Sequence, residues 1–335
     1  MHWLEFFISA GIIVFAGIRL TIYADKLSDE LQLGKVWIGI VLLGLVTSLP
    51  EAITSLVSII SLGADNLAIG NLLGSNNFNP MLIVVMDVLY RRGALTSSIQ
   101  PSSLHKVSAC FAMLLSGIVI IDIIFNVPVL NFYNTSLSMG SLMIAVFYFV
   151  GMRQLAILSA GKTVITPSSE KLSQQSATMI RIWTQLLISA ALVIVGAIWL
   201  ARSADIIAQQ TGLGGTFFGS IFLAFVTSLP ELVVSISALR LGSLDLAIGN
   251  IFGSNMTNMF IVFICSLFHR GAPILSAVSK VHMITAALSI LLTYVAVKGI
   301  YVRNKKTVFG LSWNSLIMIF FFVAGTCILY TLRLL

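Results

Sequence analysis

The sequence predicts an all-α polytopic membrane protein with ten transmembrane helices, arranged as two inverted five-helix repeats with broken helices beside buried carboxylates. Three observations indicate this fold class. Hydrophobic residues make up 58% of the 335 residues, and charged residues only 9%. The apolar residues fall into ten stretches of about 20 residues, the length that crosses a bilayer. One hexapeptide also occurs twice, about half a chain apart.

The composition excludes several classes of protein. Soluble domains contain roughly 25% charged residues, so this chain has too few to cover a water-exposed surface. Its mean hydropathy of +1.03 indicates that lipid surrounds most of it. The net charge of +7 comes from 19 basic and 12 acidic residues, and the basic ones lie mainly in loops. We therefore expect the lipid bilayer as the main partner, no nucleic acid and no cofactor, and the sequence indicates no obligatory protein partner.

The predicted spans form two sets of five, separated by a polar stretch. A polar segment of about 20 residues divides the chain into a first repeat (1–158), a linker (159–179) and a second repeat (180–335). The ten spans lie near residues 3–24, 36–61, 66–89, 106–125, 136–157, 180–202, 216–241, 246–268, 279–300 and 309–332.

Loop charge predicts the orientation, because Lys and Arg concentrate on the cytoplasmic side. With the N-terminus outside, 15 of the 19 basic residues lie on the inner side, and the other four lie outside: Arg202, Arg270, Lys280 and Arg333. We therefore expect a multi-pass protein of the plasma (inner) membrane, with both termini outside and the linker in the cytoplasm.

The internal repeat is visible in two identical segments. V-T-S-L-P-E occupies residues 46–51 and 226–231, and L-A-I-G-N occupies residues 67–71 and 246–250. Five spans separate the copies, and an odd number makes equivalent helices cross the bilayer in opposite directions. This is the inverted-repeat plan of many secondary transporters, whose substrate sites lie near the midplane where the repeats meet.

Glu51 and Glu231 are the most informative residues, because each lies inside an apolar segment. A carboxylate at the bilayer centre costs at least about 2.5 kcal/mol on insertion scales. A lone glutamate could be protonated and hydrogen-bonded between helices, but two at equivalent positions indicate a functional site. Pro50 and Pro230 directly precede them and should kink or break each helix. The alternative role for the prolines is a simple packing kink.

Polar side chains continue from both glutamates at helical spacing. The first stripe contains Thr47, Glu51, Ser55 and Ser58, and its copy contains Thr227, Glu231 and Ser235. The following spans carry Asn71, Ser75 and Asn79, and Asn250, Ser254 and Asn258. Small polar groups also hold membrane helices together, which is the alternative for the Ser and Asn residues.

Hydroxyl, amide and carboxylate oxygens form a ligand set suited to hard cations such as Ca²⁺, Na⁺ or Mg²⁺. These motifs contain no His and no Cys. Two carboxylates balance one divalent cation, and they repel one another when it leaves. Monovalent cations or protons should then replace the divalent cation, and this competition is the physical basis of exchange.

The duplicated pattern T-S-L-P-E followed by G-N-x-x-G-S-N-x-x-N resembles the two alpha repeats of the cation/calcium exchanger superfamily, best known from the sodium/calcium exchangers. The resemblance covers essentially the whole chain. It implies antiport of Ca²⁺ against Na⁺ by alternating access, with the first and sixth spans sliding against the rest. It assigns ion-ligand roles to Thr47, Ser48, Glu51, Ser75, Asn79, Thr227, Ser228, Glu231, Ser254 and Asn258.

One departure from the family pattern bears on coupling. Many relatives carry an acid at the position of Asn258, so the amide at this position puts potassium coupling and stoichiometry in question.

H⁺ as the coupling ion, or Mn²⁺ or Mg²⁺ as the divalent cation, remains an alternative on the same fold. An intramembrane enzyme is disfavoured, because the sequence has no HExxH motif, no Gly-x-Gly-Asp aspartate pair and no Ser/His pair in adjacent motifs.

Overall fold

The structure is an all-α bundle of long helices. The computed structural model describes residues 2–90, 93–125, 128–132, 135–160, 172–210, 224–308 and 310–333. The long helices are α1 (His2–Glu30), α4 (Leu49–Leu62), α5 (Asp65–Leu89), α7 (Ser103–Phe125), α8 (Met139–Ala160), α9 (Leu172–Gln210), α11 (Leu229–Arg240), α12 (Leu244–Phe268), α14 (Val281–Val302) and α15 (Trp313–Arg333).

Within the described ranges, nine helical segments are long and apolar enough to cross a membrane. They correspond to nine of the ten predicted spans, so the predicted fold class is confirmed. The remaining span, predicted over 216–241, is described only from residue 224 onward. Of the predicted linker, residues 172–179 belong to α9, and 161–171 lie outside the described residues.

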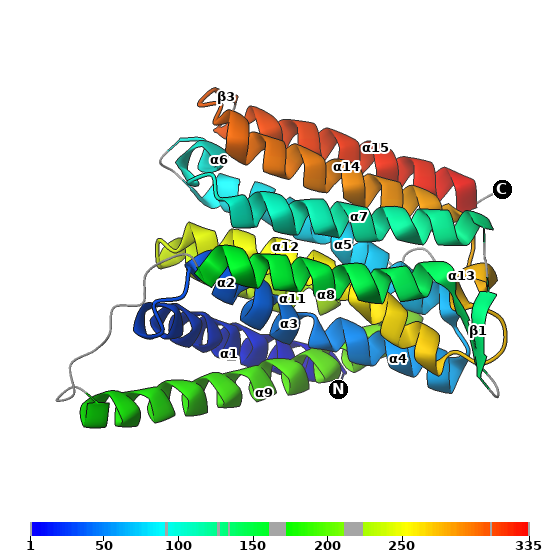
Figure 1. Cartoon of the computed structure of the whole chain (residues 1–335), viewed down its shortest axis with the longest axis horizontal. Helices are drawn as coiled ribbons and strands as arrows, with labels where there is room; N and C mark the ends of the chain where they lie inside the picture. The colour runs from blue at the N-terminus through cyan, green and yellow to red at the C-terminus, as the bar shows by residue number, and fades with distance from the viewer. Residues whose placement is uncertain are drawn as a thin grey trace.

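The arrangement of the helices leaves two of them in the middle of the bundle. Helices α1 and α9 lie side by side along one edge, and α14 and α15 lie together along the opposite edge (Figure 1). Helices α5 and α12 pack against each other and are the most buried of the candidate spans. These two are the Asn/Ser helices of the repeated motifs, so the duplicated polar residues lie in the protein interior.

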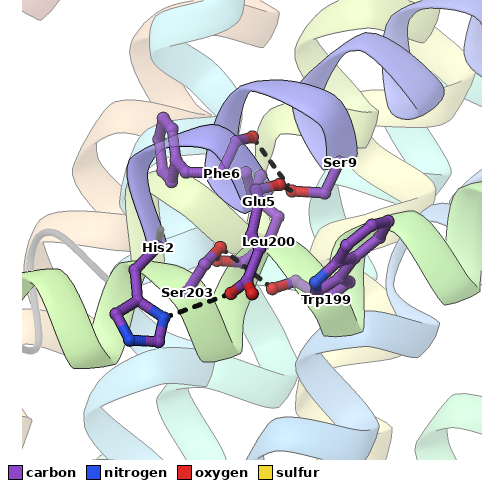
Figure 2. Close-up of polar contacts among 7 residues, drawn as sticks. All are labelled: His2, Glu5, Phe6, Ser9, Trp199, Leu200 and Ser203. Carbon is purple, nitrogen blue, oxygen red and sulfur yellow. Dashed lines mark hydrogen bonds and ion pairs between the residues drawn. The ribbon is translucent and has the colours of Figure 1, made fainter.

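The contact between α1 and α9 is close and largely apolar. A Cβ atom at Gly196 on α9 would lie 3.1 Å from the side chains of both Ile12 and Ile13 on α1. Figure 2 shows the crossing near the start of α1, where Ser9 and Ser203 hydrogen-bond to backbone carbonyls of their own helices. These two hydroxyls are therefore satisfied within their own helices, and farther along the crossing Arg19 of α1 donates a hydrogen bond to the side-chain oxygen of Gln185 of α9 at 3.4 Å.

The second span is broken as predicted. It comprises α2 (Lys35–Ile38), the π-helical turn η1 (Gly39–Leu43) and α3 (Gly44–Thr47), and α4 begins at Leu49 after a turn at Ser48. Pro50 lies in the first turn of α4, where its missing N–H leaves no intrahelical bond unmade. In the second repeat, Ser228 separates a helical segment over 224–227 from α11 in the same way.

Glycines let the broken second span contact the backbone of α12 directly. A Cβ atom at Gly39 would lie 2.5 Å from the carbonyl oxygen of Leu246, and one at Gly253 would lie 2.4 Å from that of Ile40. In the reciprocal contact, between α5 and the helical segment over 224–227, a Cβ atom at Gly74 would lie 2.9 Å from the Cβ atom of Ala224. The close helix approach that these glycines permit brings Thr47 within reach of α12.

Short elements connect the helices at the two ends of the bundle. The antiparallel hairpin of β1 (Pro128–Phe132) and β2 (Thr135–Ser138) lies near α13 (Ile274–Ala277) at one end (Figure 1). Helix α6 (Leu95–Ser98) and the hairpin of β3 (Thr307–Val308) and β4 (Leu311–Ser312) lie at the other. No strand was predicted, because these pairs contain at most five residues per strand and lie between apolar helices.

Candidate cation site

Glu51 lies near the middle of the second span, in the first turn of α4. Its side chain is fully buried. The carboxylate oxygen Oε1 accepts hydrogen bonds from Ser75 on α5 at 3.3 Å and from Ser228 of the second repeat at 3.4 Å. The other oxygen, Oε2, has no hydrogen-bond partner among the described residues. Both repeats therefore hold this carboxylate, and one of its oxygens is free to bind a cation.

Glu231 occupies the equivalent position in the first turn of α11 and is also fully buried. Its Oε1 accepts a hydrogen bond from Ser254 on α12 at 3.4 Å, and its Oε2 has no partner within the described part of the chain. Ser254, which donates to Glu231, also contacts Thr47, one helical turn before Glu51, so the two carboxylates lie in adjoining parts of the bundle interior. A buried pair of carboxylates needs compensating positive charge, which neighbouring hydroxyls and amides do not supply.

The threonines connect the two repeats. The Thr47 hydroxyl lies 3.1 Å from Oδ1 of Asn250 and 3.1 Å from the hydroxyl of Ser254. In the reciprocal contact, the Thr227 hydroxyl donates to Oδ1 of Asn71 at 3.2 Å. Each threonine precedes the break of its own helix and contacts the Asn/Ser helix of the other repeat.

Two asparagine side chains donate their amide hydrogens and leave their oxygens free. Asn79 Nδ2 donates to Oδ1 of Asn255 at 2.9 Å, and Asn258 Nδ2 donates to Oδ1 of Asn76 at 3.0 Å. The Oδ1 atoms of Asn79 and Asn258 are buried and have no partner among the residues described. A buried acceptor without a donor is unfavourable, and a bound cation would satisfy both of these oxygens.

All ten predicted residues are buried, and they form the polar cluster. Nine of them make side-chain hydrogen bonds to other residues of the repeated motifs, and Ser48 lies at the break beside Thr47 with its hydroxyl unpaired in the described structure. Five unpaired oxygens belong to predicted residues: Ser48 Oγ, Glu51 Oε2, Asn79 Oδ1, Glu231 Oε2 and Asn258 Oδ1. Such oxygens suit a hard cation.

Sequence analysis did not assign a role to Asn76 or Asn255, although each follows the serine of its motif. The signal was present, because Gly-Ser-Asn occurs at 74–76 and again at 253–255. A second duplicated feature, a histidine in the first turn of α7 and of α14, was also missed. In α7, Nε2 of His105 lies 3.6 Å from Oδ1 of Asp245. In α14, Nε2 of His282 lies 3.2 Å from Oδ1 of Asn66.

The ligand chemistry is that of a site for hard cations. Among the described residues, no three His, Cys, Asp or Glu side chains gather in a way that could hold a metal ion. The cluster instead combines two carboxylates with neutral hydroxyl and amide oxygens. That combination favours Ca²⁺ and Na⁺ over soft metals, and it limits the formal negative charge to two.

Comparison with known proteins finds relatives in sequence and a match in fold. The chain is 28% identical over 253 residues to the inner membrane protein YrbG of Escherichia coli, covering 75% of this chain and 74% of that protein. It is 29% identical over 146 residues to the sodium/calcium exchanger MaX1 of Methanosarcina acetivorans, covering 43% of this chain and only 39% of that relative. Its fold matches the sodium–calcium exchanger NCX_Mj with a TM-score of 0.73 at 19% identity, over 98% of this chain and 99% of the other.

The family profile described as sodium/calcium exchanger protein matches residues 1–154 and 181–331. The two matched segments include both copies of the repeated motif and every residue of the polar cluster. This family consists of transporters, which agrees with a buried cation site and excludes an enzyme. The chain therefore belongs to the sodium/calcium exchanger family of membrane cation exchangers.

Proposed function

We propose that this protein exchanges Ca²⁺ for Na⁺ across the membrane by alternating access, using the cluster around Glu51 and Glu231 as the transport site. The main support is a set of five buried oxygens that have no hydrogen-bond partner among the described residues: one oxygen of each carboxylate, together with Ser48 Oγ, Asn79 Oδ1 and Asn258 Oδ1. The similarity to MaX1, a sodium/calcium exchanger, supports the same ion pair. The ligands are the ten residues predicted from the sequence, from Thr47 to Asn79 and from Thr227 to Asn258.

Charge balance explains how such a site couples two ions. One Ca²⁺ or two Na⁺ neutralise the two carboxylates, whereas an empty site leaves two buried charges that repel one another. The empty site is therefore unfavourable, and the protein should change its access side mainly when loaded. That requirement converts a binding competition into obligatory exchange.

The position of the site suits alternating access. Glu51 and Asn79 lie near the middle of their spans, Lys35–Leu62 and Asp65–Leu89. We assign the first repeat to residues 1–158, the cytoplasmic linker to 159–179 and the inverted second repeat to 180–335. Both termini then lie outside, and the name of YrbG supports placement in an inner membrane.

Flux measurements in proteoliposomes test the ion pair. Vesicles containing the purified protein and loaded with Na⁺ should accumulate ⁴⁵Ca²⁺ when diluted into Na⁺-free medium, and protein-free vesicles should not. The same vesicles with a proton gradient in place of the Na⁺ gradient should show no uptake. Uptake driven by protons alone would contradict Na⁺ coupling, and preferential competition by Mn²⁺ or Mg²⁺ would contradict Ca²⁺ as the substrate.

A further inference from the structure

Asn76 and Asn255 form a reciprocal bridge between α5 and α12, directly behind the site. Asn76 Nδ2 donates to the backbone carbonyl of Asn255 at 3.2 Å, and Asn255 Nδ2 donates to the backbone carbonyl of Asn76 at 3.3 Å. Both side chains are fully buried. Their remaining oxygens accept the amide hydrogens of Asn258 and Asn79 respectively. In both repeats, therefore, the bridging asparagine donates to a backbone carbonyl of the other helix and accepts a hydrogen bond from a predicted ligand asparagine of that helix.

The two backbone carbonyls determine the orientation of every amide in this network. A carbonyl oxygen only accepts, so Asn255 must turn Nδ2 toward the Asn76 carbonyl and Oδ1 toward Asn79. Asn79 must then turn its own Nδ2 toward Asn255, which directs its Oδ1 away from the bridge. In the same way, the Asn255 carbonyl accepts from Asn76 Nδ2, so Asn76 Oδ1 faces Asn258 and accepts a hydrogen bond from its Nδ2. Reversing either ligand amide would bring two acceptors together.

We propose that Asn76 and Asn255 are positioning residues that hold the Asn258 and Asn79 amides with their oxygens toward the transported cation. This inference rests on the proposed transport site and adds the groups that fix its two neutral amide ligands. An asparagine without this bridge could present either a ligand oxygen or an amide N–H to the site, and an N–H repels a cation. The bridge removes that ambiguity before an ion arrives.

A carboxylate needs no such orientation, because both of its oxygens are acceptors, and this difference provides the test. Asn76→Leu should weaken Ca²⁺ binding about tenfold in the wild-type background, a change of roughly 1.4 kcal/mol. In an Asn258→Asp background, the same Asn76→Leu change should weaken binding less than about threefold. This non-additivity is the signature of two residues that act through one another. The mirror experiment pairs Asn255→Leu with Asn79→Asp.

Thr293→Val is the matched control. It removes the hydroxyl that Asn255 Nδ2 contacts at 3.4 Å and leaves the bond from Asn79 to Asn255 in place. Thr293 is buried beside the bridge, so its removal perturbs packing at the same depth. Ca²⁺ affinity should stay within about twofold of wild type, even if the melting temperature falls.

Binding of ⁴⁵Ca²⁺ to purified folded protein, with thermal stability measured in parallel, decides the outcome. Equal fold-losses from Asn76→Leu in the two backgrounds would overturn the proposal, because a packing role is additive. Unchanged affinity in the wild-type background would overturn it as well.

If Asn76→Leu does not fold, Asn76→Ser replaces it in the cycle, because serine is too short to reach Asn258. If wild type binds Mn²⁺ or Na⁺ but no Ca²⁺, the Ca²⁺ proposal fails, and the same cycle run with the bound ion tests the bridge separately.

Discussion

The hydroxyl of Ser228 lies 3.4 Å from Oε1 of Glu51, so the residue at the helix break of the second repeat contacts the carboxylate of the first. Ser254 makes the corresponding connection, because its hydroxyl lies within hydrogen-bond distance of both Thr47 and Glu231. Each carboxylate is therefore held at the boundary between the repeats. A relative movement of the repeats must change the surroundings of both carboxylates together.

Glu51→Gln and Glu231→Gln should each reduce Na⁺-driven ⁴⁵Ca²⁺ uptake to the level of protein-free vesicles. Each substitution removes half of the formal negative charge of the site and leaves its volume nearly unchanged, so the variants should still insert and fold. Size-exclusion profiles check the folding. Glu30→Gln is the control, because Glu30 is exposed at the end of α1, and it should transport like wild type. Near-normal uptake by either site variant would contradict the shared-carboxylate mechanism.

The sequence predicted most of the fold, because long apolar stretches leave few structures other than membrane-spanning helices. It also predicted the helix breaks, from Pro50 and Pro230. It did not predict the π-helical turn over Gly39–Leu43, which lies where the second span contacts the backbone of α12. That contact depends on how two helices far apart in the chain pack, which a local pattern does not contain.

The polar residues of the site were predictable because they are duplicated, whereas their hydrogen-bond partners were not. Nothing in the Gly-Ser-Asn pattern indicates which atom of Asn76 faces Asn258. Two aspartates illustrate the same limit. Asp87 and Asp122 lie near helix ends, and the sequence does not indicate their partners: Asp87 accepts hydrogen bonds from the backbone N–H groups of Leu95 and Ser312, and Asp122 accepts one from Ser138.

Exchange by the wild-type protein should not require K⁺. With amides at Asn79 and Asn258, the site carries two formal charges, which one Ca²⁺ or two Na⁺ neutralise. An additional cation would be poorly held in a buried site of low dielectric. Na⁺-driven ⁴⁵Ca²⁺ uptake should therefore be the same when K⁺ on both sides is replaced by choline. A strict requirement for K⁺ would show that a further cation is part of the transport cycle.

Asn258→Asp should make exchange more sensitive to acid. The substitution places a third carboxylate in a buried cluster where two already repel one another, and like charges favour the protonated form. As the pH falls, the third carboxylate should bind a proton and compete with cation binding, so uptake should decline at a higher pH than in wild type. The measurement is the pH profile of uptake for both proteins. Asn258→Ala is the comparison variant, and it should lower ion affinity without moving the profile. An unmoved profile for Asn258→Asp would place Asn258 outside the site.

Gly253→Ala should destabilise the protein, whereas Gly117→Ala should not. A Cβ atom at position 253 would lie 2.4 Å from the Ile40 carbonyl oxygen, so the second span and α12 would have to separate. Overpacking of this kind costs about 1–3 kcal/mol. Gly117 is the matched control in α7, because a Cβ atom there meets nothing within 4 Å. Thermal unfolding in detergent measures the difference, and equal melting temperatures for the two variants would contradict the backbone contact.

Cross-linking should show which helices move during exchange. If α1 and α9 slide together against the rest, a disulfide between them should leave exchange intact, whereas one between α1 and α11 should block it. Gly196 lies against Ile12, which provides the first cysteine pair, Ile12→Cys with Gly196→Cys. A Cβ atom at Gly17 would lie 3.4 Å from the Cβ of Val233, close to disulfide geometry, which provides the second pair, Gly17→Cys with Val233→Cys.

Both pairs need a background in which the three native cysteines, Cys110, Cys265 and Cys327, are replaced. Uptake of ⁴⁵Ca²⁺ is measured before oxidation, after oxidation and after reduction, so that each protein is its own control for damage by substitution. The α1–α11 pair should lose uptake on oxidation and regain it on reduction, while the α1–α9 pair stays active throughout. Inhibition by the α1–α9 disulfide would show that the two helices move relative to each other. Full activity with the α1–α11 disulfide would show that α1 keeps its place on the bundle while access changes.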